Sequence, residues 1–263
     1  MTSHTFTFMG TGAGCGVPAF FCDCKACEEA RHNPKARRGD CSVMITGSKK
    51  VLIDTPPDLR HYLIRENVRS IDRLLYTHAH YDHLGGLGEL EYMSRLYTKE
   101  HISTYASNRA LSTINHEFHY LKDILDEHEL EPYASFTYDD VNYTALPVQH
   151  APGTYGYLIE TPATRLFYAC DTGKLPDETA KLVKDCDILI LDGTYWERSW
   201  SPETHNSIQG AIEQAFKLNA KKFYPTHLAM HYDTAISLAE LEAYVAQYEG
   251  RVEIPYDGLS IAI

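Results

Sequence analysis

Four potential metal ligands lie within six residues of the segment LLYTHAHYDHLGG. They are His78, His80, Asp82 and His83. An apolar run ending at Tyr76 precedes them and a helical pattern begins near Leu84, so the ligands occupy a turn between a strand and a helix. Side chains alternate between the two sides of an extended backbone, so His78 and His80 point to the same side. The turn that follows changes the direction of Asp82 and His83. So dense a group of imidazoles and carboxylate predicts a metal site, and one such loop can serve two ions.

Three more apolar runs end in a ligand-type residue, namely ALPVQH at His150, RLFYACD at Asp171 and KFYPTH at His227. A lone histidine after a strand is more often structural than ligating, so each run is weak evidence by itself. Together with the first group they form a set for two ions, with Asp171 as the bridge. The first ion takes His78, His80 and His150, and the second takes Asp82, His83 and His227. Imidazole and carboxylate donors suit zinc, manganese or iron.

The segment FFCDCKACEE places three of the seven cysteines within six positions. Cys22, Cys24 and Cys27 are one donor short of a closed tetrahedral zinc site, so their spacing predicts a structural zinc with a more distant fourth ligand. Four other thiols compete for that place: Cys15, Cys41, Cys170 and Cys186. The patterns around Cys170 and Cys186 are also those of small buried apolar residues.

Short β-rich runs recur from TFTFM near Phe6 to LSIAI at the end of the sequence. Helical periodicity lies between them, over or within residues 24–32, 58–66, 84–96, 108–130, 177–184, 207–218 and 238–248. We expect His116, His119 and His128 to be partly exposed positions of the helix within 108–130. Since no repeat or flexible linker interrupts the pattern, we predict a single α/β domain over residues 1–263, with an N-terminal zinc-binding loop at about residues 15–40.

The 263 residues carry a formal net charge of -12, and the acidic side chains are spread along the sequence. This charge disfavours a long polyanion such as nucleic acid as a partner. The basic run RHNPKARR is more typical of a solvated face than of a binding patch. No apolar run approaches the roughly 20 residues of a membrane span, and there is no export leader. We therefore expect a cytoplasmic protein with reduced thiols and no membrane contact.

The segment GTGAGCG, from Gly10 to Gly16, is rich in glycine. It lacks the spacing of a dinucleotide-binding loop, and the lysine and hydroxyl residue of a P-loop do not follow it. We interpret it as a turn that needs positive φ or a close backbone approach near the metals.

The chain resembles the metallo-β-lactamase superfamily of binuclear hydrolases through its His-x-His-x-Asp-His motif and the later His150, Asp171 and His227. The segments TFMGTGAGCGVPAFFCDCKAC, YGYLIET, CDTGKLP and ETHNS are similar to the PhnP-like phosphodiesterases of that superfamily. The resemblance implies a four-layer αβ/βα sandwich with two divalent metals, zinc or manganese, at one edge. It also implies hydrolysis of a small cyclic phosphodiester, such as phosphoribosyl 1,2-cyclic phosphate or a 2',3'-cyclic nucleotide.

The resemblance further assigns roles to two histidines. His231 lies four residues beyond His227 and would be the fourth ligand of the structural zinc, at a spacing one residue longer than is usual for the family. His205 would stabilise a phosphoryl oxygen or protonate the leaving group. Asp82 has a second oxygen that would orient the attacking water. The loop before His205 contains three aromatic residues, Tyr195, Trp196 and Trp200. They either line the substrate pocket or pack against the rest of the protein.

Two other functions stay open at this point. An RNase Z-like endonuclease that processes tRNA 3' ends would share the metal motif, but such enzymes usually carry a basic Gly/Pro-rich arm that this sequence lacks. A zinc-dependent nucleic-acid-binding module would use residues 22–27 as its knuckle and RHNPKARR as its contact. The net charge of -12 and the complete ligand set argue against it. The oligomeric state is open as well, a homodimer included.

Overall fold

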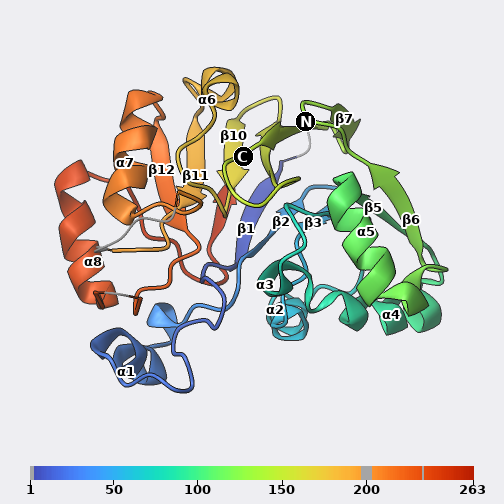
Figure 1. Cartoon of the computed structure of the whole chain (residues 1–263), viewed down its shortest axis with the longest axis horizontal. Helices are drawn as coiled ribbons and strands as arrows, with labels where there is room; N and C mark the ends of the chain where they lie inside the picture. The colour runs from blue at the N-terminus through green and yellow to red at the C-terminus, as the bar shows by residue number, and fades with distance from the viewer. Residues whose placement is uncertain (1–2, 197–202, 233) are drawn as a thin grey trace.

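The computed structural model describes residues 3–196, 203–232 and 234–263. In this part of the chain the strands form two sheets that face each other (Figure 1). The first sheet has the order β13-β1-β2-β3-β4-β5-β6, with strands β1 (Thr5–Gly10), β2 (Ser42–Thr46), β3 (Lys50–Ile53), β4 (Arg73–Leu75), β5 (Ile102–Ala106), β6 (Leu125–Glu129) and β13 (Ser260–Ala262). The second has the order β12-β11-β10-β9-β8-β7, with strands β7 (Ser135–Tyr138), β8 (Val141–Pro147), β9 (Tyr155–Glu160), β10 (Arg165–Ala169), β11 (Ile188–Asp192) and β12 (Lys222–Thr226).

Helices cover the outer face of each sheet (Figure 1). Next to the first sheet lie α2 (Leu59–Arg65), α3 (Tyr81–Leu84), α4 (Leu90–Tyr92), a π-helical segment (Met93–Thr98) and α5 (Asn108–Glu117). Next to the second lie α6 (Asp177–Val183), α7 (Ile208–Lys217) and α8 (Leu238–Val245), and α1 (Lys25–His32) follows the N-terminal loop. Short 3-10 turns lie at Pro34–Ala36, Leu87–Glu89, His119–Leu121 and Ala246–Tyr248. Side chains cap α8, because Ser237 and Glu240 form a capping box at its N-terminus.

Three apolar cores separate the layers. The central core lies between the sheets, and each outer core lies between one sheet and its helices. Strand β10 shows how the sequence builds them, because Leu166 and Tyr168 enter the central core while Phe167 and Ala169 enter the outer one. The sequence of a strand that is buried on both faces is a continuous run of apolar residues. The predicted αβ/βα sandwich is therefore confirmed, while the extent of one domain over residues 1–263 stays a prediction.

The parallel strands of both sheets position the candidate site. Strands β3 to β6 run parallel to one another, and so do β10, β11 and β12. The carboxyl ends of parallel strands lie at one edge of a sheet, and ligands commonly bind at that edge. Three site residues follow such strand ends: His78 after β4, Asp171 after β10 and His227 directly after β12.

The helix expected within residues 108–130 is only partly correct. Helix α5 ends at Glu117, and residues Leu125–Glu129 form the strand β6, which pairs in parallel with β5. His128 therefore lies on a strand, where its ring stacks on Tyr105 at 4.5 Å. The charged sequence LDEHE suits this strand because β6 is at the edge of its sheet, where charged side chains prevent further strand pairing.

In the described part of the chain, no helix combines the length and the apolar composition that a bilayer crossing requires.

Candidate binuclear metal centre

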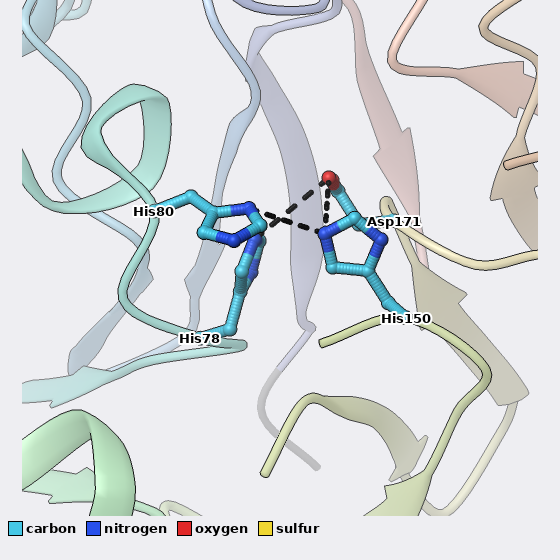
Figure 2. A group of neighbouring side chains, drawn as sticks. All are labelled: His78, His80, His150 and Asp171. Atoms are coloured by element: carbon cyan, nitrogen blue, oxygen red, sulfur yellow. Dashed lines mark hydrogen bonds and ion pairs between the residues drawn. The ribbon is translucent and has the colours of Figure 1, made fainter. Parts of the chain in front are cut away.

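The loop between β4 and α3 brings its histidines against residues from the second sheet. Figure 2 shows His78 and His80 opposite His150 and Asp171, and the ligand atoms of these four side chains all lie within 4.8 Å of one another. His80 Nδ1 and His150 Nε2 are 3.2 Å apart. A second group with the same spacing contains Asp82, His83 and His227. The structure thus brings together all seven residues of the predicted set, in the two predicted groups.

Asp171 lies between the two groups, with one carboxylate oxygen toward each. Its Oδ1 is 3.1 Å from His83 Nε2 and 3.3 Å from His227 Nε2. Its Oδ2 is 3.5 Å from His150 Nε2 and 3.8 Å from His78 Nε2. This is the geometry that a bridging ligand requires.

The donor atoms fit two divalent cations. His78 Nε2, His83 Nε2 and Asp171 Oδ1 are buried and have no hydrogen-bond partner among the described residues. A buried polar atom without a hydrogen-bond partner lowers the folding stability by roughly 1–3 kcal/mol. Three such atoms that converge on one place therefore need a group that compensates them. Cations would compensate them, and nitrogen with carboxylate oxygen is a common donor set for zinc and manganese.

Hydrogen bonds fix the orientation of three of the imidazoles, those of His78, His83 and His227. The Nδ1 of His83 lies 3.0 Å from Asp54 Oδ2, and the Nδ1 of His78 lies 3.0 Å from the Thr77 hydroxyl, which itself donates to Asp54. The Nδ1 of His227 lies 2.8 Å from Thr194 Oγ1. Because these partners accept the Nδ1 proton, the Nε2 atoms are left to face the two groups with their lone pairs.

His205 lies beside both ligand groups, with a ligand atom within 4.8 Å of those of Asp171 and His227. Its ring lies 4.8 Å from that of His150 and stacks at 5.3 Å on that of His227. Its Nδ1 is 2.6 Å from Oδ2 of Asp192, which is completely buried. Since a carboxylate only accepts, Nδ1 carries the proton and Nε2 is the nitrogen that can exchange one.

Asp54 and Asp192 are part of the site but were missed from the sequence. Asp192 also accepts from the backbone and hydroxyl of Thr194, at 2.9 and 2.8 Å, and so links His205 to the residue that holds His227. Both carboxylates end apolar runs, VLID and ILILD, and both strands are parallel. The strand-end rule that identified Asp171 would have found them.

An open cleft of about 830 Å³ lies over the metal centre. One wall is the GTGAGCG turn, where Cys15 and Gly16 have φ values of 73° and 61°. A Cβ on Gly14 would lie 3.1 Å from Asp82 Oδ2, so this turn does approach the centre closely, as predicted. Tyr195 lines the cleft, whereas Trp196 packs on Tyr244 at 4.7 Å. Trp200 lies outside the described residues.

The cysteine cluster lies beside this wall. The ligand atoms of Cys22, Cys27 and His231 are within 4.8 Å of one another. Cys24 is not in this group, although its thiol contacts those of Cys22 and Cys27, and its backbone N–H donates to the Cys22 thiol and lowers the pKa of that thiol. Among the rival donors, Cys15 is adjacent, with Sγ 3.7 Å from His231 Nε2. The others lie elsewhere: Cys41 contacts Thr226, Cys170 faces Asp54 and His83, and Cys186 is in an outer core.

Similarity to known proteins identifies the family to which the chain belongs. The model of one family, described as a beta-lactamase superfamily domain, matches residues 49–228. The octanoyltransferase of Porphyromonas gingivalis is 25% identical over 232 residues, which are 85% of this chain and 45% of that protein. This chain therefore spans less than half the length of that curated relative.

Solved structures agree on the fold. A diphosphatase from the PhnP family superposes with a TM-score of 0.87 at 28% identity, covering 100% of this chain and 98% of that one. The zinc-bound PqqB of Methylobacterium extorquens superposes with a TM-score of 0.79 at 19% identity, covering 98% and 100%. The chain belongs to the beta-lactamase superfamily. Within it, the fold and the neighbours are those of a metal-dependent hydrolase.

Proposed function

We propose that this chain is a two-metal phosphodiesterase that hydrolyses a small cyclic phosphodiester. The observation that carries the proposal is Asp171, whose two oxygens face two separate groups of buried ligands below an open cleft. When bound, two divalent cations would acidify a water and stabilise the charge of a phosphoryl transition state. The similarity to the PhnP-family diphosphatase supports phosphorus chemistry.

The residues of the chain have distinct parts in this reaction. Asp82 directs Oδ2 at His83 and His227, at 3.5 and 3.4 Å, so its other oxygen can accept a hydrogen bond from the attacking water. His205 keeps Nδ1 on Asp192 and can donate from Nε2 to the leaving oxygen. The cleft volume of about 830 Å³ suits a small ligand, and the net charge of -12 disfavours a long polyanion.

The direct test uses purified protein loaded with zinc or manganese. We expect hydrolysis of bis(p-nitrophenyl) phosphate and of at least one ribose or nucleoside cyclic phosphate. If none of these substrates is hydrolysed, the proposal is wrong. A separate assay supplies precursor tRNA. Its cleavage at the 3' end would favour the RNase Z-like alternative.

Replacing His205 with alanine should lower kcat about a hundredfold to a thousandfold, because a positioned proton donor or electrostatic group contributes in that range. Asp192→Asn should have a smaller effect in the same direction, since it removes the acceptor that fixes the ring. The bound metal content should not change in either variant. His116→Ala is the control, because that histidine is exposed on α5. Wild-type kcat in His205→Ala would rule out this role.

A further inference from the structure

One exposed aromatic residue is part of the motif that supplies the candidate metal ligands. Tyr81 stands between His80 and Asp82, which belong to the two different ligand groups. It lines the cleft and is 75% exposed, so its ring lies outside the three apolar cores. Burial stabilises a fold in proportion to the apolar area removed from water. The Tyr81 ring therefore adds little to the folding stability in this way, and its apolar surface is available in the cleft.

Helix α3 holds the Tyr81 ring in place. Tyr81 is the first residue of this helix, and its carbonyl accepts a hydrogen bond from the Gly85 N–H at 2.7 Å. A Cβ on Gly85 would lie 2.7 Å from the Tyr81 ring, so glycine leaves the space that the ring occupies. In the described part of the chain, no hydrogen bond engages the Tyr81 hydroxyl and no second aromatic ring packs on Tyr81. The ring is thus positioned by its own helix and remains open to a ligand.

The cleft offers both polar and apolar contacts. The ligand groups and His205 suit a phosphodiester, which needs cations and proton donors. Tyr81, Pro18 and Pro57 line the same cleft with exposed apolar surface, which a phosphate group cannot use. The complementary ligand therefore has a phosphate at one end and a flat apolar group at the other. A nucleobase is such a group, and bases stack on aromatic side chains because every base has a π-face.

The place of Tyr81 in the chain matches the dimensions of a nucleotide. Successive Cα atoms are about 3.8 Å apart, so the Tyr81 backbone is adjacent to a ligand of each group. In a nucleoside 2',3'-cyclic phosphate, the base and the phosphate are attached to one ribose ring. We therefore expect a base to reach the Tyr81 ring while the phosphate lies over the ligand groups.

We infer that Tyr81 stacks on the base of a nucleoside 2',3'-cyclic phosphate and so determines how tightly the organic half of the substrate binds. Stacking does not read the edge of a base, so we expect purine and pyrimidine nucleosides both to bind. A sugar cyclic phosphate without a base remains a substrate, with a higher KM. This inference rests on the proposed phosphodiesterase function and narrows its substrate class.

The kinetic test compares two substrates that differ only in the group at the base position. Adenosine 2',3'-cyclic phosphate carries a base, and methyl β-ribofuranoside 2,3-cyclic phosphate carries a methoxy group in its place. We expect the metal-loaded enzyme to have a KM about tenfold lower for the adenosine substrate, because one stacked base contributes in that range. Tyr81→Ala should raise this KM about tenfold and abolish the preference. Tyr81→Phe should keep the preference, since the ring remains.

Metal analysis separates stacking from a structural role, because Tyr81 lies between two candidate ligands. Tyr81→Ala should retain the wild-type metal content. Equal losses of kcat/KM on both substrates with less bound metal would overturn the inference, as would a wild-type enzyme with no preference for the adenosine substrate. Tyr92→Ala is the matched control, since Tyr92 is 66% exposed on α4 and is not among the described residues that line the cleft.

A binding measurement makes the test independent of turnover. Calorimetric titration of the metal-loaded protein uses adenosine 3'-phosphate, which ring opening of the cyclic phosphate can yield. The Kd should be about tenfold lower for wild type than for Tyr81→Ala. Equal Kd values would overturn the stacking role. If neither cyclic phosphate is hydrolysed, the proposed function is wrong, and the titration alone then decides whether Tyr81 binds a base.

Discussion

Replacing Asp171 with alanine should lower kcat/KM for phosphodiester hydrolysis by at least about a thousandfold, or about 4 kcal/mol of transition-state stabilisation. Asp171 is 3% exposed, and its Oδ1 faces one ligand group while its Oδ2 faces the other. Without this carboxylate, the two groups would lose the negative charge that would stabilise two bound cations. Steady-state kinetics and metal analysis of the purified variant measure the effect.

The matched control is Asp177→Ala, at the N-terminus of α6 and six positions further along the same segment. It should retain wild-type activity and metal content. A rate for Asp171→Ala close to that of the control would show that the two ligand groups do not work as one centre.

Replacing Cys27 with serine should remove one bound metal and destabilise the fold. Structural zinc contributes roughly 10–16 kcal/mol of folding free energy in zinc-finger peptides, so losing one ligand should cost at least about 3 kcal/mol. Cys27 is fully buried in an outer core, next to the loop that carries Cys22 and Cys24. Metal analysis and urea denaturation at equal protein concentration measure the two effects.

Cys186→Ser controls for the burial of a hydroxyl group. Cys186 is fully buried in the same outer core but is not part of the cysteine cluster. It should retain the full metal content and be destabilised less than Cys27→Ser. Equal metal content and equal urea midpoints in the two variants would refute the structural zinc.

The cysteine cluster also connects two walls of the cleft. His231 follows the predicted ligand His227 by four residues, and its cluster partner Cys22 follows the GTGAGCG turn. The Tyr232 hydroxyl donates to the Gly14 carbonyl at 2.8 Å, beside Asp82. A zinc at this cluster would therefore hold the N-terminal turn against the segment that positions His227.

The positions of the candidate metal ligands could be predicted because they lie in a short motif or directly after strands. His78 to His83 form one short motif, and Asp171 and His227 follow parallel strands whose ends converge. The apolar runs and helical patterns were enough to predict an α/β domain, whereas the two-sheet sandwich was predicted from the family resemblance. The structure confirms it, with alternate residues of β10 entering different cores.

Other features depend on tertiary contacts that the sequence does not display. Strand β6 is polar and short, and it exists because β5 supplies its hydrogen bonds. The roles of Asp54 and Asp192 similarly depend on the histidines that fold against them.

The central claim is that the two ligand groups joined by Asp171 would hold two cations, and that the chain hydrolyses phosphodiesters in this cleft. The most direct measurement titrates metal-depleted protein with zinc or manganese and follows bis(p-nitrophenyl) phosphate hydrolysis together with bound metal. We expect activity to rise until two metals are bound beyond any zinc at the cysteine cluster, with none of this gain in Asp171→Ala. Full metal loading without hydrolysis, or maximal activity with a single active-site metal, would contradict the claim.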